Sequence, residues 1–237
     1  MEPRNNHLGQ PIGEPLEAWC PALKPPRISV EGRFCRVEAI DVDRHAADLF
    51  SSFRTDKENR NWTYLPYGPF DTEASFKTWM TDTCLGDDPL FHSVVDLATG
   101  RAVGVASYLR IEPAVGVIEV GHINFSPLIQ RTPVATEAMY LMMRRVFNDL
   151  GYRRYEWKCD ALNAPSRRAA ERLGFQFEGV FRQATMYKTR NRDTAWYSIL
   201  DHEWPGLDQA FAAWLGEENF DSDGQQKIKL GALIERS

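Results

Sequence analysis

The stretch Glu119 to Glu137, E-V-G-H-I-N-F-S-P-L-I-Q-R-T-P-V-A-T-E, has the pattern of a strand, a loop and the start of a helix. A helix start presents unpaired N–H groups and the positive end of the helix dipole, so it can bind a phosphate or diphosphate through backbone amides alone. Many strand-to-helix junctions share this property. The chain has neither G-x-x-x-x-G-K-[ST] nor G-x-G-x-x-G, which argues against an ordinary nucleoside triphosphate or dinucleotide site.

The residues that usually bind metals are scattered. The five histidines form no H-E-x-x-H or H-x-x-x-H pattern, so we expect no metal site. The four cysteines contain no C-x-x-C pair and are expected to be reduced thiols. These cysteines are Cys20, Cys35, Cys84 and Cys159.

The clearest helix is predicted over Pro133 to Asp149, where apolar residues recur every three or four positions. Thr132 is expected to cap it, Pro133 occupies the favoured first position, and Gly151 ends it.

Weaker patterns predict the other elements. Asp43 and Asp71 are expected to cap helices that begin near Asp43 and over Asp71 to Met80. The segment Asn61 to Phe70 is expected to be an aromatic loop, and Phe91 to Phe125 an antiparallel meander. The remaining predictions are strands at Arg33–Ala39, Tyr155–Asp160, Phe175–Gly179, Ala184–Lys188 and Ala195–Leu200, and helices at Ala164–Leu173, before Gly174, and Leu207–Leu215.

Domain boundaries follow the proline pattern. Residues 1–27 contain six prolines and should form an extended arm without a fold of its own, pinned by Trp19 and Leu23. Residues 28–204 are expected to form the main domain, and residues 205–237 a C-terminal helix and tail.

Composition is that of a globular protein: 237 residues, 43% hydrophobic and 26% charged. No apolar run is long enough to span a bilayer or resembles a signal peptide, so we expect a cytoplasmic protein without membrane contacts. The net charge is −5, but residues 144–192 carry 12 Lys/Arg against 5 Asp/Glu, a local excess of +7. This excess fits a small polyanion or an RNA surface, although a solvated helical face is the more frequent explanation.

Taken together and in order, several segments resemble the GCN5-related N-acetyltransferases (GNAT), particularly the branch that acetylates ribosomal-protein N-termini. The resemblance covers roughly residues 30–204 and rests on I-E-V-G-H-I-N-F, the loop Gln130 to Ala135, V-A-T-E-A-M-Y-L-M-M-R-R-V-F and C-D-A-L-N-A-P-S-R-R-A-A-E-R-L-G-F-Q-F-E-G. It implies an α/β (α+β) fold with a mixed, V-splayed, mostly antiparallel sheet flanked by helices. Acetyl-CoA, as co-substrate, would enter between two parallel strands, Gly121 to Phe125 and Tyr155 to Asp160.

The resemblance also implies residues that hold the coenzyme. The family's diphosphate loop reads R/Q-x-x-G-x-G/A; Gln130 and Ala135 match its ends, whereas Pro133 replaces the first glycine and lacks an N–H. The amides of Arg131, Thr132, Val134, Ala135 and Thr136 would then form the cradle.

Four residues at the start of the predicted helix Ala164–Leu173 complete the implied coenzyme site. Asn163 would bind the pantetheine arm, unless it is only a turn or cap residue. Ser166 would meet the departing thiolate or a phosphate, and Arg167 and Arg168 would meet phosphates, unless both arginines are simply solvated. Ala170 stands where many relatives carry a tyrosine acid, which excludes such an acid from this helix.

The chemistry requires a neutral amine, hence a base or a water chain. Glu119 is the first candidate, and an exposed or ion-paired carboxylate is the alternative. The backbone amides of Ile123, Asn124 and Phe125 would hold the oxyanion.

Four further side chains are candidates for contact with the acceptor: Trp62, Tyr64, Tyr67 and His122. Core packing is the more frequent fate of such aromatic residues, and a structural role the more frequent one of a strand histidine.

The sequence thus predicts an acyl-CoA-dependent N-acyltransferase that moves an acetyl group, or a larger acyl group, onto a primary amine of a peptide N-terminus or small molecule. Its partners would be acyl-CoA and the acceptor, with a homodimer left open and no nucleic acid expected. A non-catalytic acyl-CoA-binding or interaction protein on the same scaffold is the alternative. An RNA-associated module rests only on the +7 segment.

Overall fold

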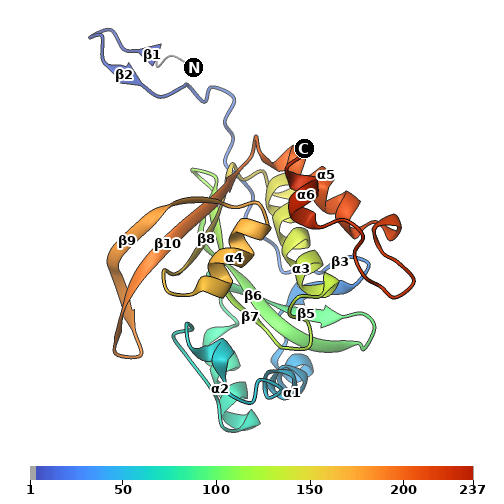
Figure 1. Cartoon of the computed structure of the whole chain (residues 1–237). Helices are drawn as coiled ribbons and strands as arrows, with labels where there is room; N and C mark the ends of the chain where they lie inside the picture. Colours follow the sequence, from blue (N-terminus) through green and yellow to red (C-terminus); the bar gives the residue numbers. More distant parts are fainter. Residues whose placement is uncertain (1–3, 237) are drawn as a thin grey trace.

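One large sheet organises the chain, of which the computed structural model describes residues 4–236. Its eight strands lie in the order β3-β4-β5-β6-β7-β8-β10-β9, and every neighbouring pair is antiparallel except β7 and β8 (Figure 1). The strands are β3 (Val30–Glu31), β4 (Cys35–Ala39), β5 (Leu90–Asp96), β6 (Arg101–Glu112), β7 (Val117–Phe125), β8 (Arg154–Asp160), β9 (Gln176–Tyr187) and β10 (Arg190–Leu200). The α/β fold class and the antiparallel meander predicted from the sequence are confirmed.

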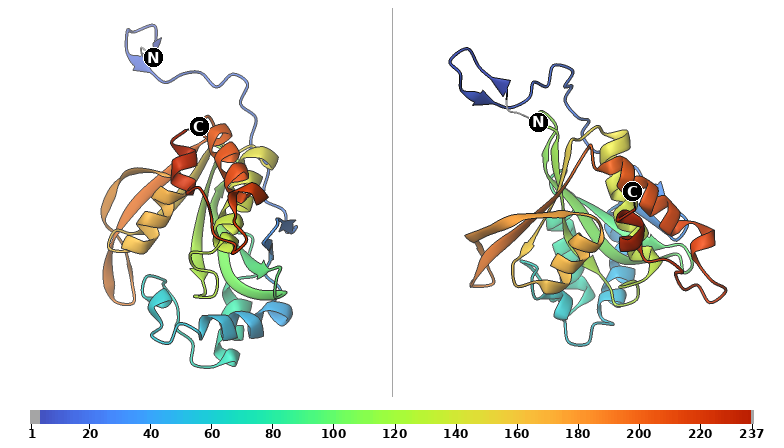
Figure 2. Two further views of the ribbon diagram at one scale, coloured as in Figure 1. Left: turned by 45° about the vertical axis from the view of Figure 1, so that its right-hand side comes forward. Right: turned by 45° about the horizontal axis from the view of Figure 1, so that its top comes forward.

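Helices cover both faces of this sheet (Figure 2). On one face α1 (Val42–Phe53) and α2 (Glu73–Thr83) enclose an aromatic core. On the other face α3 (Pro133–Arg144), α4 (Ala164–Arg172) and α5 (Trp204–Leu215) pack over a larger core, which the short α6 (Leu230–Ile234) also joins. Alternate residues of the central strands, such as Val94 and Val95, point into the two cores.

The caps of α1 and α2 correct the sequence predictions. Asp41, not Asp43, accepts from the amide of Arg44 at 3.1 Å, whereas Asp43 pairs with Lys77. Thr72, not Asp71, caps α2 in a capping box with Ser75.

The central helix begins at Pro133 as predicted, but its cap differs. Thr132 occupies the N-cap position, yet its hydroxyl donates to the carbonyl of Ile129 at 2.8 Å and accepts from no helix amide. After Arg144 the helix continues as a π-helical turn, Arg145–Asp149, before Gly151 turns the chain at φ +74°.

The C-terminal hairpin is longer than predicted. Strand β9 joins the two predicted strands Phe175–Gly179 and Ala184–Lys188 into one element, and β10 begins at Arg190 instead of Ala195. Lys188 and Thr189, both at positive φ, form the turn. The strands stay paired across two register shifts, where bulges bend the hairpin.

The N-terminal arm projects from the body (Figure 1). It contains a small hairpin of β1 (Arg4–Asn5) and β2 (Pro11–Ile12) that the sequence did not predict, and the first three residues of the expected arm lie outside the described residues, as does residue 237 of the tail. The indole of Trp19 anchors the arm by donating to the carbonyl of Ala114 at 3.0 Å. Among residues 4–236, no helix is long and apolar enough to cross a membrane.

Candidate active site

The parallel strands β7 and β8 separate in the middle of the sheet. Their pairing runs from Val117 with Arg154 to Val120 with Trp157, and neither strand's later residues pair with the other. A bulge marks the separation on β7: Gly121 pairs with Ser107 and Asn124 with Val105, which leaves His122 and Ile123 opposite a single residue of β6. His122 adopts a φ of 51°. The bulge therefore redirects the backbone of β7 where the strands open.

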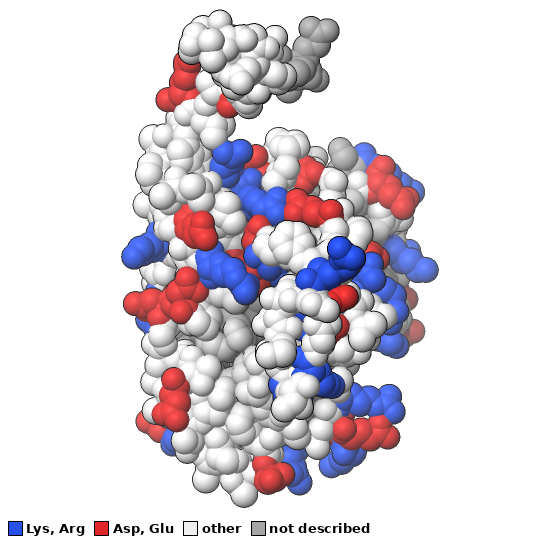
Figure 3. All heavy atoms as spheres, turned by 90° about the vertical axis from the view of Figure 1, so that its left-hand side faces the viewer, with Lys and Arg blue, Asp and Glu red and all other residues white. Residues whose placement is uncertain are grey.

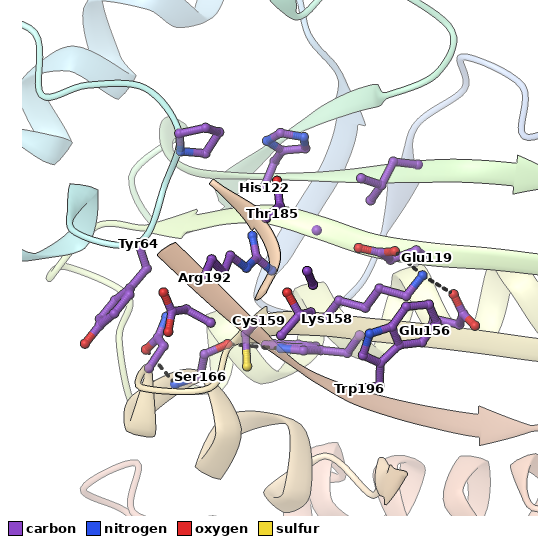
Figure 4. A pocket seen from close by; sticks show the side chains of 18 of the residues that line it. Tyr64, Glu119, His122, Glu156, Lys158, Cys159, Ser166, Thr185, Arg192 and Trp196 are labelled. Atoms are coloured by element: carbon purple, nitrogen blue, oxygen red, sulfur yellow. Dashed lines mark hydrogen bonds and ion pairs between the residues drawn. The ribbon is translucent and has the colours of Figure 1, made fainter. Parts of the chain in front are cut away.

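A cleft of about 920 Å³ lies at this opening. Strands β6, β7, β8, β9 and β10 and the loop after α1 form its walls, and the start of α4 borders one end (Figure 4). Of the side chains proposed from the sequence, six residues line it: Tyr64, Glu119, His122, Ile123, Asn163 and Ser166.

Glu119 lies at the closed end of the cleft in a buried ion-pair network (Figure 4). Its carboxylate accepts from the guanidinium of Arg110 and lies 3.0 Å from the Nζ atom of Lys158. Lys158 also lies 2.7 Å from Glu156, and its Nζ atom is 3.7 Å from the centre of the Trp196 ring. Of the two alternatives for Glu119, the ion pair is present and the exposed carboxylate is wrong, because the side chain is 4% exposed.

Burial controls the protonation of this carboxylate. It raises the pKa of Glu119 above its ordinary value, and the positive charges of Lys158 and Arg110 offset this rise only in part. A carboxylate with a raised pKa is a better proton acceptor when it is ionised. Glu119 therefore combines a favourable basicity with two cations that compete for its lone pairs.

His122 faces the cleft from the bulge and pairs with Tyr67 behind it. The phenol oxygen of Tyr67 lies 3.0 Å from Nδ1 of His122, with the two rings stacked. Burial lowers the pKa of His122 to about 4 and raises that of Tyr67 well above its ordinary value. The hydrogen bond thus joins a neutral phenol to a neutral imidazole, and the tautomer of His122 decides which of the two donates. Tyr67 itself does not line the cleft.

The remaining aromatic candidates divide. Tyr64 lines the cleft, and its hydroxyl donates to the carbonyl of Leu162 at 3.2 Å. Trp62 is 4% exposed and packs against Phe53 and Phe70 in the core under α1 and α2. The interpretation of Trp62 as an acceptor-contacting residue is therefore wrong, because its loop folds the indole inward to bury apolar area.

At the start of α4, Asn163 caps the helix by accepting from the amide of Ser166 at 3.2 Å. The Ser166 hydroxyl accepts from the indole N–H of Trp157 at 3.0 Å and lies beside the buried thiol of Cys159, whose pKa burial raises. Both helix residues line the cleft, as Trp157 does.

Neither Arg167 nor Arg168, the two arginines of α4 expected to meet phosphates, lines the cleft. Arg167 donates to the hydroxyl of Tyr197 at 2.9 Å, so it is engaged within the fold and not simply solvated. Arg168 is exposed and, among the described residues, has no partner. Ala170 is wholly buried in the core between α4 and the sheet.

The loop before α3 leaves most of its amides free. In the described part of the chain no group accepts from the backbone N–H of Arg131, Val134 or Ala135, whereas the amide of Thr132 donates to Ile129. Three of the five amides of the predicted cradle can thus donate to an anion. The amide of Thr132 is already used, and Thr136 is the fourth residue of α3, where the helix's own hydrogen bonds begin. Thr136 also holds Arg172, whose guanidinium donates to its hydroxyl at 3.1 Å.

The same loop is tied to the cleft through Gln130. Its side-chain amide donates to the carbonyl of Phe125 at 2.8 Å and to Asn61, a residue of the cleft wall. Asn124 and Phe125 pair with β6 and do not line the cleft, so Ile123 is the only one of the three predicted oxyanion residues in its wall.

Several cleft residues were missed by the sequence analysis: Arg110, Glu156, Lys158, Arg192 and Trp196. They come from three strands, β6, β8 and β10, and meet only through the register of the sheet. Lys158 and Trp196 stand directly opposite each other on β8 and β10. The one available signal was the alternation of Arg192, Thr194 and Trp196 along β10.

Comparisons with known proteins identify the class of protein to which this fold belongs. A family model for the acetyltransferase (GNAT) domain matches residues 36–176. The chain belongs to the GNAT acetyltransferase family.

Individual relatives extend this match. A crystal structure of a GCN5-related N-acetyltransferase from Brucella melitensis is 50% identical, with a TM-score of 0.91 over 93% of this chain and 100% of that one. A probable acetyltransferase of the GNAT family from Chromobacterium violaceum is 43% identical, with a TM-score of 0.76 over 83% of this chain and 98% of that one. The uncharacterized N-acetyltransferase YnaD of Bacillus subtilis is 29% identical over 86 residues, 36% of this chain and half of that protein.

Proposed function

We propose that this protein is an acyl-CoA-dependent N-acyltransferase that transfers an acetyl group, or a larger acyl group, to a primary amine of a small molecule or peptide N-terminus. The observation that carries the proposal is the opening between β7 and β8 at the His122–Ile123 bulge, together with free amides at the helix that β7 leads to. A more distant GNAT-fold structure, the self-immunity acetyltransferase MccE, was solved with acetyl-CoA and AMP.

The residues present fit a bound acyl-CoA. The free amides of Arg131, Val134 and Ala135 suit a diphosphate. Asn163 keeps its side-chain N–H groups available while its oxygen caps α4. The coenzyme would supply the activated acyl group, and the amide of Ile123 would stabilise negative charge on the acyl oxygen.

Deprotonation of the acceptor falls to Glu119 in this proposal. In its ionised form this carboxylate is more basic than an ordinary glutamate, and proton transfer to it requires that Arg110 or Lys158 release one lone pair. Ser166 is proposed to stabilise the departing thiolate, because its hydroxyl is fixed by Trp157 at the cleft end beside α4.

Membership of the ribosomal-protein branch finds support only in a Vibrio cholerae neighbour at 18% identity, which shows the fold alone.

The test measures binding and turnover separately. Acetyl-CoA should raise the melting temperature of the protein, and free thiol should appear only when an amine from a mixed panel of peptides and small amines is added. Mass spectrometry would identify the acetylated product. Stabilisation without thiol release across the panel would establish the alternative, a non-catalytic acyl-CoA-binding protein. Absence of stabilisation by any acyl-CoA would reject both.

A matched pair of variants tests the role of Asn163. Asn163→Asp keeps a side-chain oxygen that can cap α4 but removes the side-chain N–H donors. We expect it to weaken acetyl-CoA binding by about tenfold with little change in melting temperature. Asn163→Ala should weaken binding and lower the melting temperature together. Equal affinity of Asn163→Asp and the parent would show that Asn163 is only a cap.

A further inference from the structure

Two buried donors in the cleft have no acceptor. Among residues 4–236, the Nε atom of Arg192 and the indole Nε1 atom of Trp196 are inaccessible to solvent and form no hydrogen bond. Arg192 also forms no ion pair there, and its guanidinium lies 6.0 Å from the centre of the Tyr187 ring. Buried donors without partners cost free energy, so their persistence in a cleft points to a ligand that pairs them.

The carboxylates near Arg192 are already engaged. Asp160 accepts from the hydroxyl of Tyr187 at 2.7 Å, and Asp193 accepts from the amide of Gln183 at 2.7 Å. Glu119 and Glu156, deeper in the cleft, share Lys158. Among the described residues Arg192 therefore has no ion-pair partner, and its positive charge helps to lower the pKa of His122.

The two donors lie on the face of the sheet that points away from α4. Thr194 and Trp196 pair with Asp160 and Lys158, and residues two apart on a strand share a face. The neighbours of Lys158 on β8, Trp157 and Cys159, belong to the core under α3 and α4. Figure 4 shows Arg192 and Trp196 among the side chains that line the cleft.

The hairpin that carries the donors also restricts access. Lys188 at its tip donates to the carbonyl of Trp62 at 2.7 Å, and Arg190 donates to that of Thr63. Two charge-assisted bonds thus join the β9–β10 turn to the loop after α1. A folded protein would have to thread its end beneath this connection, whereas a small molecule would not. The outer surface of the hairpin side carries mixed charges (Figure 3), so the uncompensated cation is a feature of the interior.

We infer that the acceptor is a small primary amine that carries its own anionic group, a carboxylate or a phosphate, and that Arg192 and Trp196 bind this group. The inference rests on the proposed function, because it assigns the acceptor half of the same cleft. Arg192 would neutralise the anion, and the indole N–H of Trp196 would donate to one of its oxygens. The amine would then lie toward Glu119, beyond Trp196.

Matched amines test this assignment. β-Alanine would be compared with β-alanine amide, and O-phosphoethanolamine with ethanolamine, as acceptors of the acetyl group from acetyl-CoA. We expect the anionic member of at least one pair to have a kcat/KM at least about tenfold higher, and the better pair distinguishes carboxylate from phosphate. The same amines would be titrated into the protein without acyl-CoA by calorimetry.

Three variants separate recognition from folding. Arg192→Gln should remove the preference for the anionic amine and leave the kcat/KM for the neutral amine within about threefold of the parent value. Trp196→Phe keeps the ring stacked on Phe181 but loses the N–H donor. It should lower the kcat/KM for the anionic amine by a smaller factor, about threefold. Arg144→Gln removes an equal charge from an exposed site on α3 and should change the kcat/KM for neither amine.

The outcomes distinguish the two proposals. Turnover of neutral and anionic amines at equal rates, unchanged by Arg192→Gln, would overturn the inference and leave the acyltransferase function intact. Acetylation of peptides in preference to every small amine would overturn it as well. Should no amine be acetylated, binding of anionic amines that is lost in Arg192→Gln would support the anion site while the proposed function fails. Absence of both turnover and binding would overturn both.

Discussion

The Nζ atom of Lys158 lies 3.0 Å from Glu119 Oε2 across the parallel strands β7 and β8, and the two side chains are 6% and 4% exposed. Glu119 stands opposite Glu156 in the strand register, and Lys158 also binds Glu156 at 2.7 Å. One buried ammonium group therefore separates two carboxylates that would otherwise repel each other. The candidate base is held in place by the charge that limits its basicity.

Replacement of Glu119 by Gln tests whether this carboxylate acts as the base. We expect Glu119→Gln to lower kcat/KM at pH 7 by about 100-fold and to recover as the pH rises, because an amine that is already neutral needs no base. The raised pKa of Glu119 places the acidic limb of the parent's pH–rate profile above the ordinary range for a glutamate. Steady-state rates from pH 5 to 10 would measure both effects.

Glu156→Gln is the control, since it removes the other carboxylate of the same ammonium group. If Glu119 contributes only an ion pair, the two variants should show similar rate losses with no recovery at high pH. A parent-like rate for Glu119→Gln at every pH would remove Glu119 from the mechanism.

Removal of the ammonium group should destabilise the fold in a pH-dependent way. Lys158→Met leaves Glu119 and Glu156 buried and adjacent, and we expect a loss of about 3 kcal/mol at pH 7. The loss should shrink as the pH falls toward 5, because protonation of one carboxylate relieves the repulsion. Urea unfolding of parent and variant at both pH values would measure it. A loss that is equal at pH 7 and pH 5 would mean that packing against Trp196, and not charge, is the main contribution of Lys158.

These charges also show where sequence reasoning reached its limit. The strand ending at Phe125 and the helix beginning at Pro133 follow from local periodicity and turn residues, and both were predicted. The opening between β7 and β8 was expected only from the family resemblance. Lys158 reaches Glu119 only through the register of two strands that are far apart in the chain. Register depends on the packing of whole strands, so one sequence does not reveal it.

Local misassignments have local causes. Asp41 and Thr72 cap their helices in place of Asp43 and Asp71, because neighbouring polar residues have nearly equal capping ability and packing selects between them. Trp62 and Tyr64 belong to one aromatic loop with no periodic pattern, yet the first is in a core and the second in the cleft. The bulge places a histidine, not a glycine, at the positive φ of position 122, so the residue type did not indicate this conformation.

His122 should remain neutral throughout the physiological range. Its pKa of about 4 lies below the ordinary value of 6.5, so between these values the unfolded chain binds a proton that the folded protein does not. Stability should therefore fall as the pH drops through this window, by up to about 3 kcal/mol from this residue. His122→Asn, which tolerates the positive φ, should show a shallower decline in urea unfolding between pH 7 and 4.5. Parallel curves for the two proteins would contradict the assignment.

The proline at the start of α3 offers a test of the diphosphate cradle in which affinity should increase. Pro133 lacks the N–H that another residue would present beside the free amides of Val134 and Ala135. Pro133→Ala adds this donor, and if the amides bind the diphosphate we expect acetyl-CoA to bind about threefold to tenfold more tightly by calorimetry. Pro205→Ala makes the same change at the start of α5 and controls for the entropy that each proline removes from the unfolded chain. If the two variants change stability alike but only Pro133→Ala binds acetyl-CoA more tightly, the added donor faces the coenzyme. Equal affinities for the parent and both variants would place the diphosphate elsewhere.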